Sequence, residues 1–576
     1  MRIAKRLGRI LAVAASALVA TSQLSNAQIV LPADANTTCA ISQAEFNSWF
    51  QTGSATANGI VDHADSLAFV PTSDCSFYKW SAQMFLWLTS PAPTKYGPGS
   101  HVFNSPVFYD VMPRDPQTHQ RTLRPNAPGK SKTLSVSISQ LGPQGKPVVF
   151  DKTGKMFTIV RPEVGPSGKP LIRNKAGAPI EIERTQIAPG GKPTFLDKSG
   201  QAIDLSPTRR GNLRLMDRSG RPIELLPTRV SINGKLFFRD SQGNLVEIEQ
   251  GQADNSVLMA QNSSLVYYAM QVNDVFAYFH SGQQNGAIKP PFTKFPTRAT
   301  ELDKIKAFAL AHGKTFPDAN ALAVEVKSAW IEMTPDLDAS KYVTMTATVP
   351  TYKKESSTLW VPESTKEVQL ALVGMHVVGS TAGHPEMIWA TFEHVSNTPN
   401  DQYVYLDRTN AVKTAPRTTT GTWLFSASGA SGPSESRRII LSDSKIMAVA
   451  GAEIGPSNII RQNAWGTLLG NNNAAVNNTR VISVNKSVID KLVGDDVRRN
   501  YIMIGATWTK DGAPPSDDQD FDAPSNHLGT STLANTTMET FDQMSNCFSC
   551  HRGNMLGTAG SRGLSHIYGE LKPLLP

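Results

Sequence analysis

Residues 367–394 read EVQLALVGMHVVGSTAGHPEMIWATFEH, and this stretch decides the fold class. Apolar residues alternate with others through both halves, which is typical of β-strands. The segment 380–385, STAGHP, separates the halves with small and turn-forming residues and predicts the turn that joins two strands. Residues 342–351, YVTMTATVPT, alternate in the same way and predict a further strand.

The same two strands carry a weak candidate for a catalytic or metal-binding cluster. If the turn is symmetric, His376 pairs near position 389 or 390, and either Glu393 or His394 then lies on its face. A shift of one residue in register decides which of the two it is. A His–Glu pair beside a tryptophan could perform acid–base chemistry, but a structural network of hydrogen bonds is the more common use of such residues.

Three helices are expected before these strands in the sequence. Residues 77–88, FYKWSAQMFLWL, have the density of large apolar groups that favours a buried helix, and residues 264–279 and 301–312 are predicted to be helical. We therefore predict an α+β fold with a β-rich body, formed by an N-terminal part, residues 28–120, and a main part, residues 251–510. Residues 121–250 are assigned to an insertion, and residues 511–576 to a linker and a short C-terminal helical segment.

Composition and charge narrow the class of protein. The 576 residues are 40% hydrophobic and 18% charged, which excludes a disordered polyelectrolyte. Residues 1–27 combine a basic start, an apolar run from Ile10 to Ala20 and the small-residue site Ser25-Asn26-Ala27, as secretory signal peptides do. Removal of residues 1–27 would lower the net charge of the chain from +8 to +4. No later segment is apolar enough to cross a bilayer, so we expect a periplasmic or secreted protein without a transmembrane segment.

The insertion at residues 121–250 has a repeated pattern of turns. Each repeat has an Asp/Asn-x-x-Gly turn beside short apolar segments, and such turns favour tight β-hairpins. The turns begin at Asp151, Asn174, Asp197, Asp217 and Asp240. We interpret this region as five degenerate β-hairpin repeats inserted into the body.

The insertion is also strongly basic. It has 22 Lys and Arg residues against 11 Asp and Glu, which leaves the rest of the mature chain at about −7. A solvated repeat surface explains this charge, and docking to an anionic surface is the alternative. The insertion contains no Trp or Tyr on which bases could stack, so no nucleic-acid partner is expected.

The chemistry is concentrated in residues 547–551, CFSCH. This C-x-x-C-H sequence is the attachment signature of c-type haem, in which Cys547 and Cys550 bind the two vinyl groups and His551 binds the iron. A redox disulfide would be expected in a βαβ context that the surroundings lack. A zinc site would need a fourth ligand, and a plain disulfide leaves His551 unexplained. One motif predicts one covalent haem c.

On these residues the C-terminal stretch 533–576 resembles the c-type cytochromes. Its flanking residues resemble exported bacterial proteins with a C-terminal haem tail and an uncharacterised body. The resemblance implies a cytochrome c-like, iron-binding segment that transfers electrons to or from a redox partner protein or a small-molecule donor. Two alternatives stay open. One is an oxidoreductase with a substrate site in the body that passes electrons to the haem, and the other is a surface protein with a structural haem.

The second axial ligand of the iron is open as well. Only 25 residues follow His551, too few for the usual methionine loop and closing helix of a small cytochrome, so the haem is expected to pack against the body. His566 could reach the iron across a Gly-rich loop, and an open position is the main alternative. His376, His384 or His394 of the body could also supply the ligand. The two remaining cysteines, Cys39 and Cys75, are predicted to form a disulfide in an oxidising compartment.

Overall fold

The computed structural model describes residues 27–113, 120–126, 132–136, 257–418, 420–427, 439–442, 444–448, 452–466, 472–515, 526–540, 543, 546–551 and 563–574. Between residues 137 and 256 it describes only short strands. The predicted signal peptide, apart from Ala27, lies outside the described residues. Within the described part of the chain, no helix is both long and apolar enough to span a bilayer.

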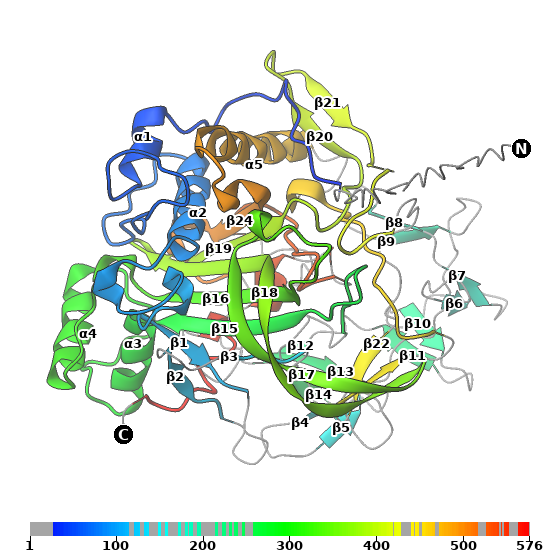
Figure 1. The fold of residues 1–576 in the computed structure, drawn as a ribbon, viewed down its shortest axis with the longest axis horizontal. Helices are drawn as coiled ribbons and strands as arrows, with labels where there is room; N and C mark the ends of the chain where they lie inside the picture. Colours follow the sequence, from blue (N-terminus) through cyan, green and yellow to red (C-terminus); the bar gives the residue numbers. More distant parts are fainter. Residues whose placement is uncertain are drawn as a thin grey trace, which may run out of the picture.

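A twelve-stranded sheet forms the centre of the molecule and confirms the β-rich body (Figure 1). Its main order is β2-β1-β15-β16-β18-β19-β24-β25, and every pair along this path is antiparallel. These strands are β1 (Phe108–Val111), β2 (Leu123–Pro125), β15 (Tyr267–Asn273), β16 (Val324–Glu332), β18 (Leu359–Thr381), β19 (His384–His394), β24 (Tyr501–Thr509) and β25 (His527–Gly529). Off this path lie β3 (Lys132–Thr133), β17 (Thr344–Ser356), β22 (Ile439–Ser442) and β23 (Lys445–Ala448). Residues 121–136, which the sequence analysis placed in the insertion, thus contribute β2 and β3 to this sheet.

The strand β18 runs through two parts of the sheet. Residues 370–379 of β18 pair with β16, and residues 374–381 pair with β19, whereas its first half pairs with β17 and β23. In Figure 1, β17 and β18 form a long curved hairpin. The predicted strand pair and its turn are therefore present, but His376 lies opposite Thr391 rather than residue 389 or 390. The register differs because the connection is only Ala382-Gly383, with φ +79° at Gly383, and the pairing is irregular next to it.

Both faces of the sheet are buried, and alternate residues of β19 divide between two cores. Even-numbered residues such as Ala390 and Phe392 face the first core, where Phe392 stacks on Phe85 of α2 with ring centroids 4.3 Å apart. Odd-numbered residues such as Met387 and Trp389 face the second core. We call these the first and the second face of the sheet.

Helices and the C-terminal segment cover these faces. The α-helices are α1 (Gln43–Ser48), α2 (Asp74–Leu88), α3 (Asp274–Gln284), α4 (Ala299–Ala311), α5 (Asn472–Lys491) and α6 (Cys547–Cys550). Short 3-10 helices span Thr94–Tyr96, Val102–Asn104, Ala319–Ala321, Ala339–Lys341, Ala464–Gly466, Val497–Asn500 and Lys510–Gly512. Figure 1 shows α2 and α5 together on one side of the sheet, and α3 beside α4. The predicted helices at 77–88 and 301–312 are confirmed as α2 and α4.

The predicted helix at residues 264–279 is wrong in its first half. Residues 267–273 form strand β15, and helix α3 begins only at Asp274. The strand is buried along its whole length because it lies inside the sheet with a core on each face. Asn273 marks the change, since its side chain accepts a hydrogen bond from the Phe276 amide and caps α3.

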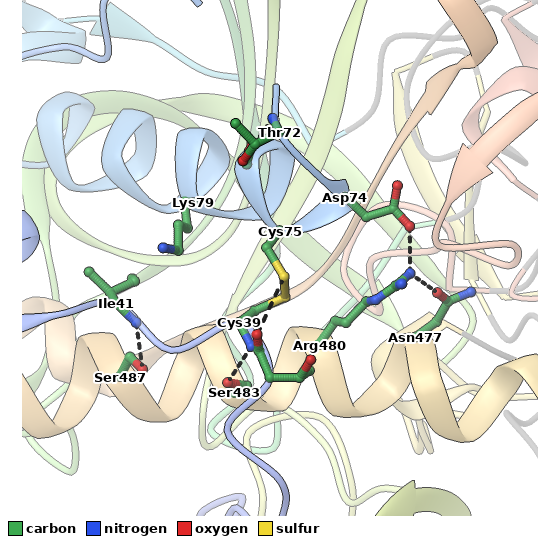
Figure 2. Close-up of a disulfide and its surroundings, with 12 residues drawn as sticks. Cys39, Ile41, Thr72, Asp74, Cys75, Lys79, Asn477, Arg480, Ser483 and Ser487 are labelled. Carbon is green, nitrogen blue, oxygen red and sulfur yellow. Dashed lines mark hydrogen bonds and ion pairs between the residues drawn. A yellow bond between two sulfur atoms is a disulfide. The ribbon is translucent and has the colours of Figure 1, made fainter. Parts of the chain in front are cut away.

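Cys39 and Cys75 form the predicted disulfide, which links the N-terminal segment to α2 (Figure 2). Ser483 and Ser487 of α5 accept hydrogen bonds from the backbone amides of Cys39 and Ile41. The disulfide therefore lies where the N-terminal segment, α2 and α5 meet.

The remaining strands form small antiparallel sheets. They are β4 (Val148–Phe150) with β5 (Met156–Thr158), β6 (Leu171–Arg173) with β7 (Pro179–Glu181), β8 (Arg184–Ile187) with β9 (Pro193–Leu196), β10 (Leu213–Met216) with β11 (Pro222–Leu225), β12 (Val230–Ile232) with β13 (Lys235–Arg239) and β14 (Leu245–Glu247), and β20 (Tyr403–Leu406) with β21 (Val412–Ala415). The five Asp/Asn-x-x-Gly turns of the repeats lie outside the described residues.

The end of the chain returns to the start of the sheet. Arg121 and Leu571 form a parallel bridge, and the Arg121 guanidinium donates to Glu570 at 2.7 Å. Arg121 is 2% exposed, so this ion pair lies largely out of solvent. It fixes the C-terminal segment beside β2.

Candidate functional site

The single turn α6 carries the CFSCH motif on the second face of the sheet. Asn546 caps it: its side-chain oxygen accepts from the Phe548 amide at 3.0 Å, and its amide group donates to the Thr530 carbonyl at 2.8 Å. The Phe548 ring is fully buried in the second core, 6.0 Å from the ring of Trp389. The motif is therefore anchored to the body through its apolar middle residue.

His551 follows directly after α6. Its Nδ1 lies 2.7 Å from the Leu564 carbonyl oxygen, and its ring lies 4.3 Å from the ring of Trp389. Burial lowers the pKa of His551 well below its usual value, and the nearby His566 lowers it further. Because a carbonyl oxygen only accepts, Nδ1 carries the proton of the neutral ring and Nε2 keeps the lone pair.

This arrangement fits a haem-binding histidine. Ligating histidines usually donate their second ring N–H to a carbonyl or carboxylate, which fixes the tautomer and the direction of the ligand nitrogen. The Leu564 carbonyl provides that partner for His551. Cys547 begins the same helical turn and Cys550 ends it, although the side chain of Cys550 lies outside the described atoms.

His566 lies beside His551, but the two rings leave no space between them for an iron atom. The two imidazole rings stack nearly parallel, with centroids 3.7 Å apart and an angle of 13° between the planes. Two histidines that bind one iron from opposite sides point their nitrogens at the metal, which then lies between the rings. Ligation by both residues therefore requires the stacked rings to separate.

Ionisable side chains of the sheet lie beside this histidine pair. On β18, His376 approaches Glu539 with 3.0 Å between Nε2 and Oε1. Burial opposes ionisation of Glu539, but the charge and hydrogen bond of His376 give a net lowering of its pKa. On β16, Glu325 accepts from the Ser565 hydroxyl at 2.7 Å. Burial raises the pKa of Glu325 to about 7, against the opposing effects of Ser565 and Lys327.

Glu393 shares the second face with His376, which resolves the register question in its favour. It does not meet His376, because it is held in a network of its own. Glu393 forms an ion pair with Arg461 at 2.6 Å, and both side chains are at most 2% exposed. The backbone amide and hydroxyl of Thr536 also donate to Glu393.

His394 faces the opposite side and lies between Tyr342 and Tyr501. Its Nδ1 accepts from the Ser396 amide at 3.2 Å, and its Nε2 lies 3.1 Å from the Lys341 carbonyl oxygen. Its ring stacks on Tyr342 at 4.1 Å. These contacts are those of a structural histidine, and the three weak catalytic candidates do not converge on one point.

His384 is the remaining body histidine that was considered as an iron ligand. Its Nδ1 lies 2.9 Å from a carboxylate oxygen of the fully buried Glu386, and its ring packs edge-on against Phe77 of α2. Among the residues that the structure describes, no group of three or more His, Cys, Asp or Glu side chains is placed to hold a metal ion.

Several residues of the site were missed at the sequence level. Trp389 contacts His551, Leu564 supplies the carbonyl for its Nδ1, and Glu325 and Glu539 place carboxylates nearby. Trp389 was noted only as part of the weak cluster. No sequence motif marks these carboxylates, because their contacts join residues that lie far apart in the chain.

Comparisons of the chain with protein-family models, with curated proteins and with solved structures gave no match.

Proposed function

We propose that the chain is an exported c-type cytochrome that binds one haem covalently through Cys547 and Cys550 and transfers electrons through it. The observation that carries the proposal is the CFSCH motif together with the 2.7 Å contact between His551 Nδ1 and the Leu564 carbonyl oxygen. When bound, the haem would supply a one-electron redox centre.

The residues around the motif would have distinct roles. His551 would direct Nε2 at the iron, with its tautomer fixed by the Leu564 carbonyl. Phe548 and Trp389 would keep water from one side of the site, because both lie in the second core. Glu325, whose pKa burial raises to about 7, would be only partly ionised near neutral pH, and the carboxylate of Glu539 would be paired with His376.

The finer parts of the architecture belong to the same proposal. Residues 1–27 would direct export to the periplasm or outside the cell, where covalent haem attachment and the Cys39–Cys75 disulfide are both compatible with the redox conditions. Residues 137–250 of the predicted insertion 121–250 would form the β-hairpin repeats, supported by antiparallel strand pairs such as β6 with β7 and β10 with β11. Its excess of Lys and Arg would dock an anionic surface or the redox partner.

The pyridine haemochrome spectrum tests covalent haem directly. In a host that matures c-type cytochromes, the wild-type protein should carry one haem that stays on the chain after denaturation. The double variant Cys547→Ser/Cys550→Ser should lose it completely, because no thiol is left to bond the vinyl groups. Cys39→Ser/Cys75→Ser is the matched control, since it also removes two thiols but leaves the motif, and it should keep the haem. A wild-type protein without covalent haem would refute the proposal.

The stacked position of His566 favours a second candidate function. If His566 stays on the face of His551, the sixth iron position is open, and the protein would be a haem-dependent oxidoreductase rather than a simple electron carrier. The spin state of the oxidised protein separates the two. A low-spin spectrum that becomes high-spin in His566→Ala supports His566 as the axial ligand and electron transfer. A high-spin spectrum that this substitution leaves unchanged supports the open position.

A further inference from the structure

A small polar pocket lies where β1, β2, β3 and β17 come together. It has a volume of about 80 Å³. Strands β1, β2, β3 and β17 contribute most of its walls, and the segment before β1 contributes the rest. The lining residues are Asn104, Asp110, Arg124, Pro125, Asn126, Lys132, Met345 and Thr346.

The lining contains two cations and one carboxylate. Lys132 Nζ lies 2.8 Å from Asp110 Oδ1, and Arg124 Nη2 lies 3.3 Å from Asp110 Oδ2. Gln271 also donates to Asp110, at 3.2 Å. Asp110 is therefore the shared acceptor for three donors, and the charges that line the pocket sum to +1.

Lys132 and Arg124 differ in their exposure to solvent. Lys132 is 7% exposed, and burial lowers the pKa of its ammonium group, against the opposing effect of Asp110. Asp110 balances one of the two positive charges that line the pocket, so an anion between Lys132 and Arg124 would be attracted to them. The Arg124 side chain is 34% exposed, so its planar fork of N–H donors is accessible to a ligand that enters from outside.

Hydrogen bonds and strand pairing hold the walls of the pocket. The Asn126 amide group donates to the Phe103 and Ser105 carbonyls at 3.4 and 3.2 Å, and Gln271 donates to the Phe103 carbonyl at 2.7 Å. Arg124 and Lys132 are held on neighbouring parts of the sheet, since β2 pairs with β1 and β3 pairs with β17. The positions of the two cations are thus set by backbone pairing rather than by flexible loops.

We propose that this pocket binds a small oxyanion, a carboxylate or a phosphate-type group, between Arg124 and Lys132. Arg presents donors in the geometry that such groups accept in pairs, and Lys adds a point charge. The pocket has room for an acetate- or phosphate-sized group.

This site is separate from the proposed haem site. Tyr109 and Leu123 point to the second core, which contains Phe548, and the alternation along β1 and β2 directs Asp110 and Arg124 to the opposite face. The proposal therefore does not depend on bound haem, and its test does not measure electron transfer.

Isothermal titration calorimetry on the full-length protein provides the test, with acetate and phosphate as probes and chloride as the reference at constant ionic strength. We expect saturable binding of acetate or phosphate at one site, and the tighter of the two identifies the planar or the tetrahedral class. Arg124→Gln should weaken this binding about tenfold or more, because it removes a charge-assisted hydrogen bond. Arg499→Gln, which removes an exposed arginine bonded to the Gly494 carbonyl, is the matched control and should bind like the wild type.

A second variant gives a change of the opposite sign. Asp110→Asn keeps an acceptor for Lys132 but removes the competing negative charge, so we expect binding to tighten about threefold or more. The fold of each variant is checked by circular dichroism. Two results would overturn the proposal: no saturable binding by either wild type or Asp110→Asn, or equal affinity in wild type and a folded Arg124→Gln variant.

Discussion

Replacing Arg461 by Met should lower the free energy of unfolding by about 3–5 kcal/mol. Arg461 is 2% exposed, and its guanidinium lies 2.6 Å from the carboxylate of Glu393, which is fully buried. The substitution would leave a buried carboxylate with only the neutral donors of Thr536 and Asn397. Breaking one partner of a buried ion pair is costly because the remaining charge cannot be hydrated.

Urea unfolding at neutral pH measures this loss, and two further variants interpret it. The double variant Arg461→Met/Glu393→Gln should recover much of the stability, because no unpaired charge remains. The matched control is Lys306→Met, which breaks the exposed ion pair between Lys306 and Asp303 on α4 and should change the stability by less than about 1 kcal/mol. If Arg461→Met is no more destabilising than this control, the cost assigned to the unpaired buried carboxylate is wrong.

Lowering the pH from 7 to about 3 should reduce the free energy of unfolding by roughly 4–5 kcal/mol through His394. Burial lowers the pKa of His394 to about 3, against an ordinary value of about 6.5. Its Nδ1 accepts from the Ser396 amide, so a protonated ring would lose this hydrogen bond. Below pH 6.5 the His394 ring is protonated in the unfolded chain but stays neutral in the folded chain. The stabilising effect is therefore complete above about pH 6.5 and is lost as the pH falls towards 3.

The measurement is the slope of unfolding free energy against pH. Between pH 6 and pH 4 this one residue should contribute up to about 1.4 kcal/mol per pH unit. His394→Gln keeps a neutral amide of similar reach, so its slope should be smaller by about one proton. At pH 8 both chains are neutral at this position, and the difference there reports packing alone. Equal slopes in the two proteins would contradict the assigned role of burial.

Much of the sheet could be predicted from local patterns. The alternation in residues 342–351 identified part of β17, whose two faces differ in burial. Residues 367–394 identified parts of β18 and β19 with the turn between them, although both strands are buried on both faces there. The register could not be predicted, since the two-residue turn and the irregular pairing beside Gly379 shift His376 to Thr391. Strand β15 was taken for a helix because a strand buried on both faces loses its alternation.

Some residues of the candidate site could also be predicted from the sequence, and others could not. Cys547, Cys550 and His551 could be found because covalent haem attachment needs its residues close together in sequence. Glu325 and Trp389 could not, because each reaches the motif through sheet pairing over more than 150 residues of chain. The oxyanion pocket was missed for the same reason, since its cations become neighbours only when β2 and β3 join the sheet.

The parallel bridge between Arg121 and Leu571 joins the first strands of the sheet to a segment that follows all the others. Residues 533–574 follow every strand of the sheet in the chain, and they supply Phe548 and Tyr568 to the second core and Thr536 to the buried Glu393. A chain without these residues would expose the part of the second core that Phe548 and Tyr568 fill, although α3 and α4 would still cover the rest. Such a chain would be a substrate for chaperones and proteases.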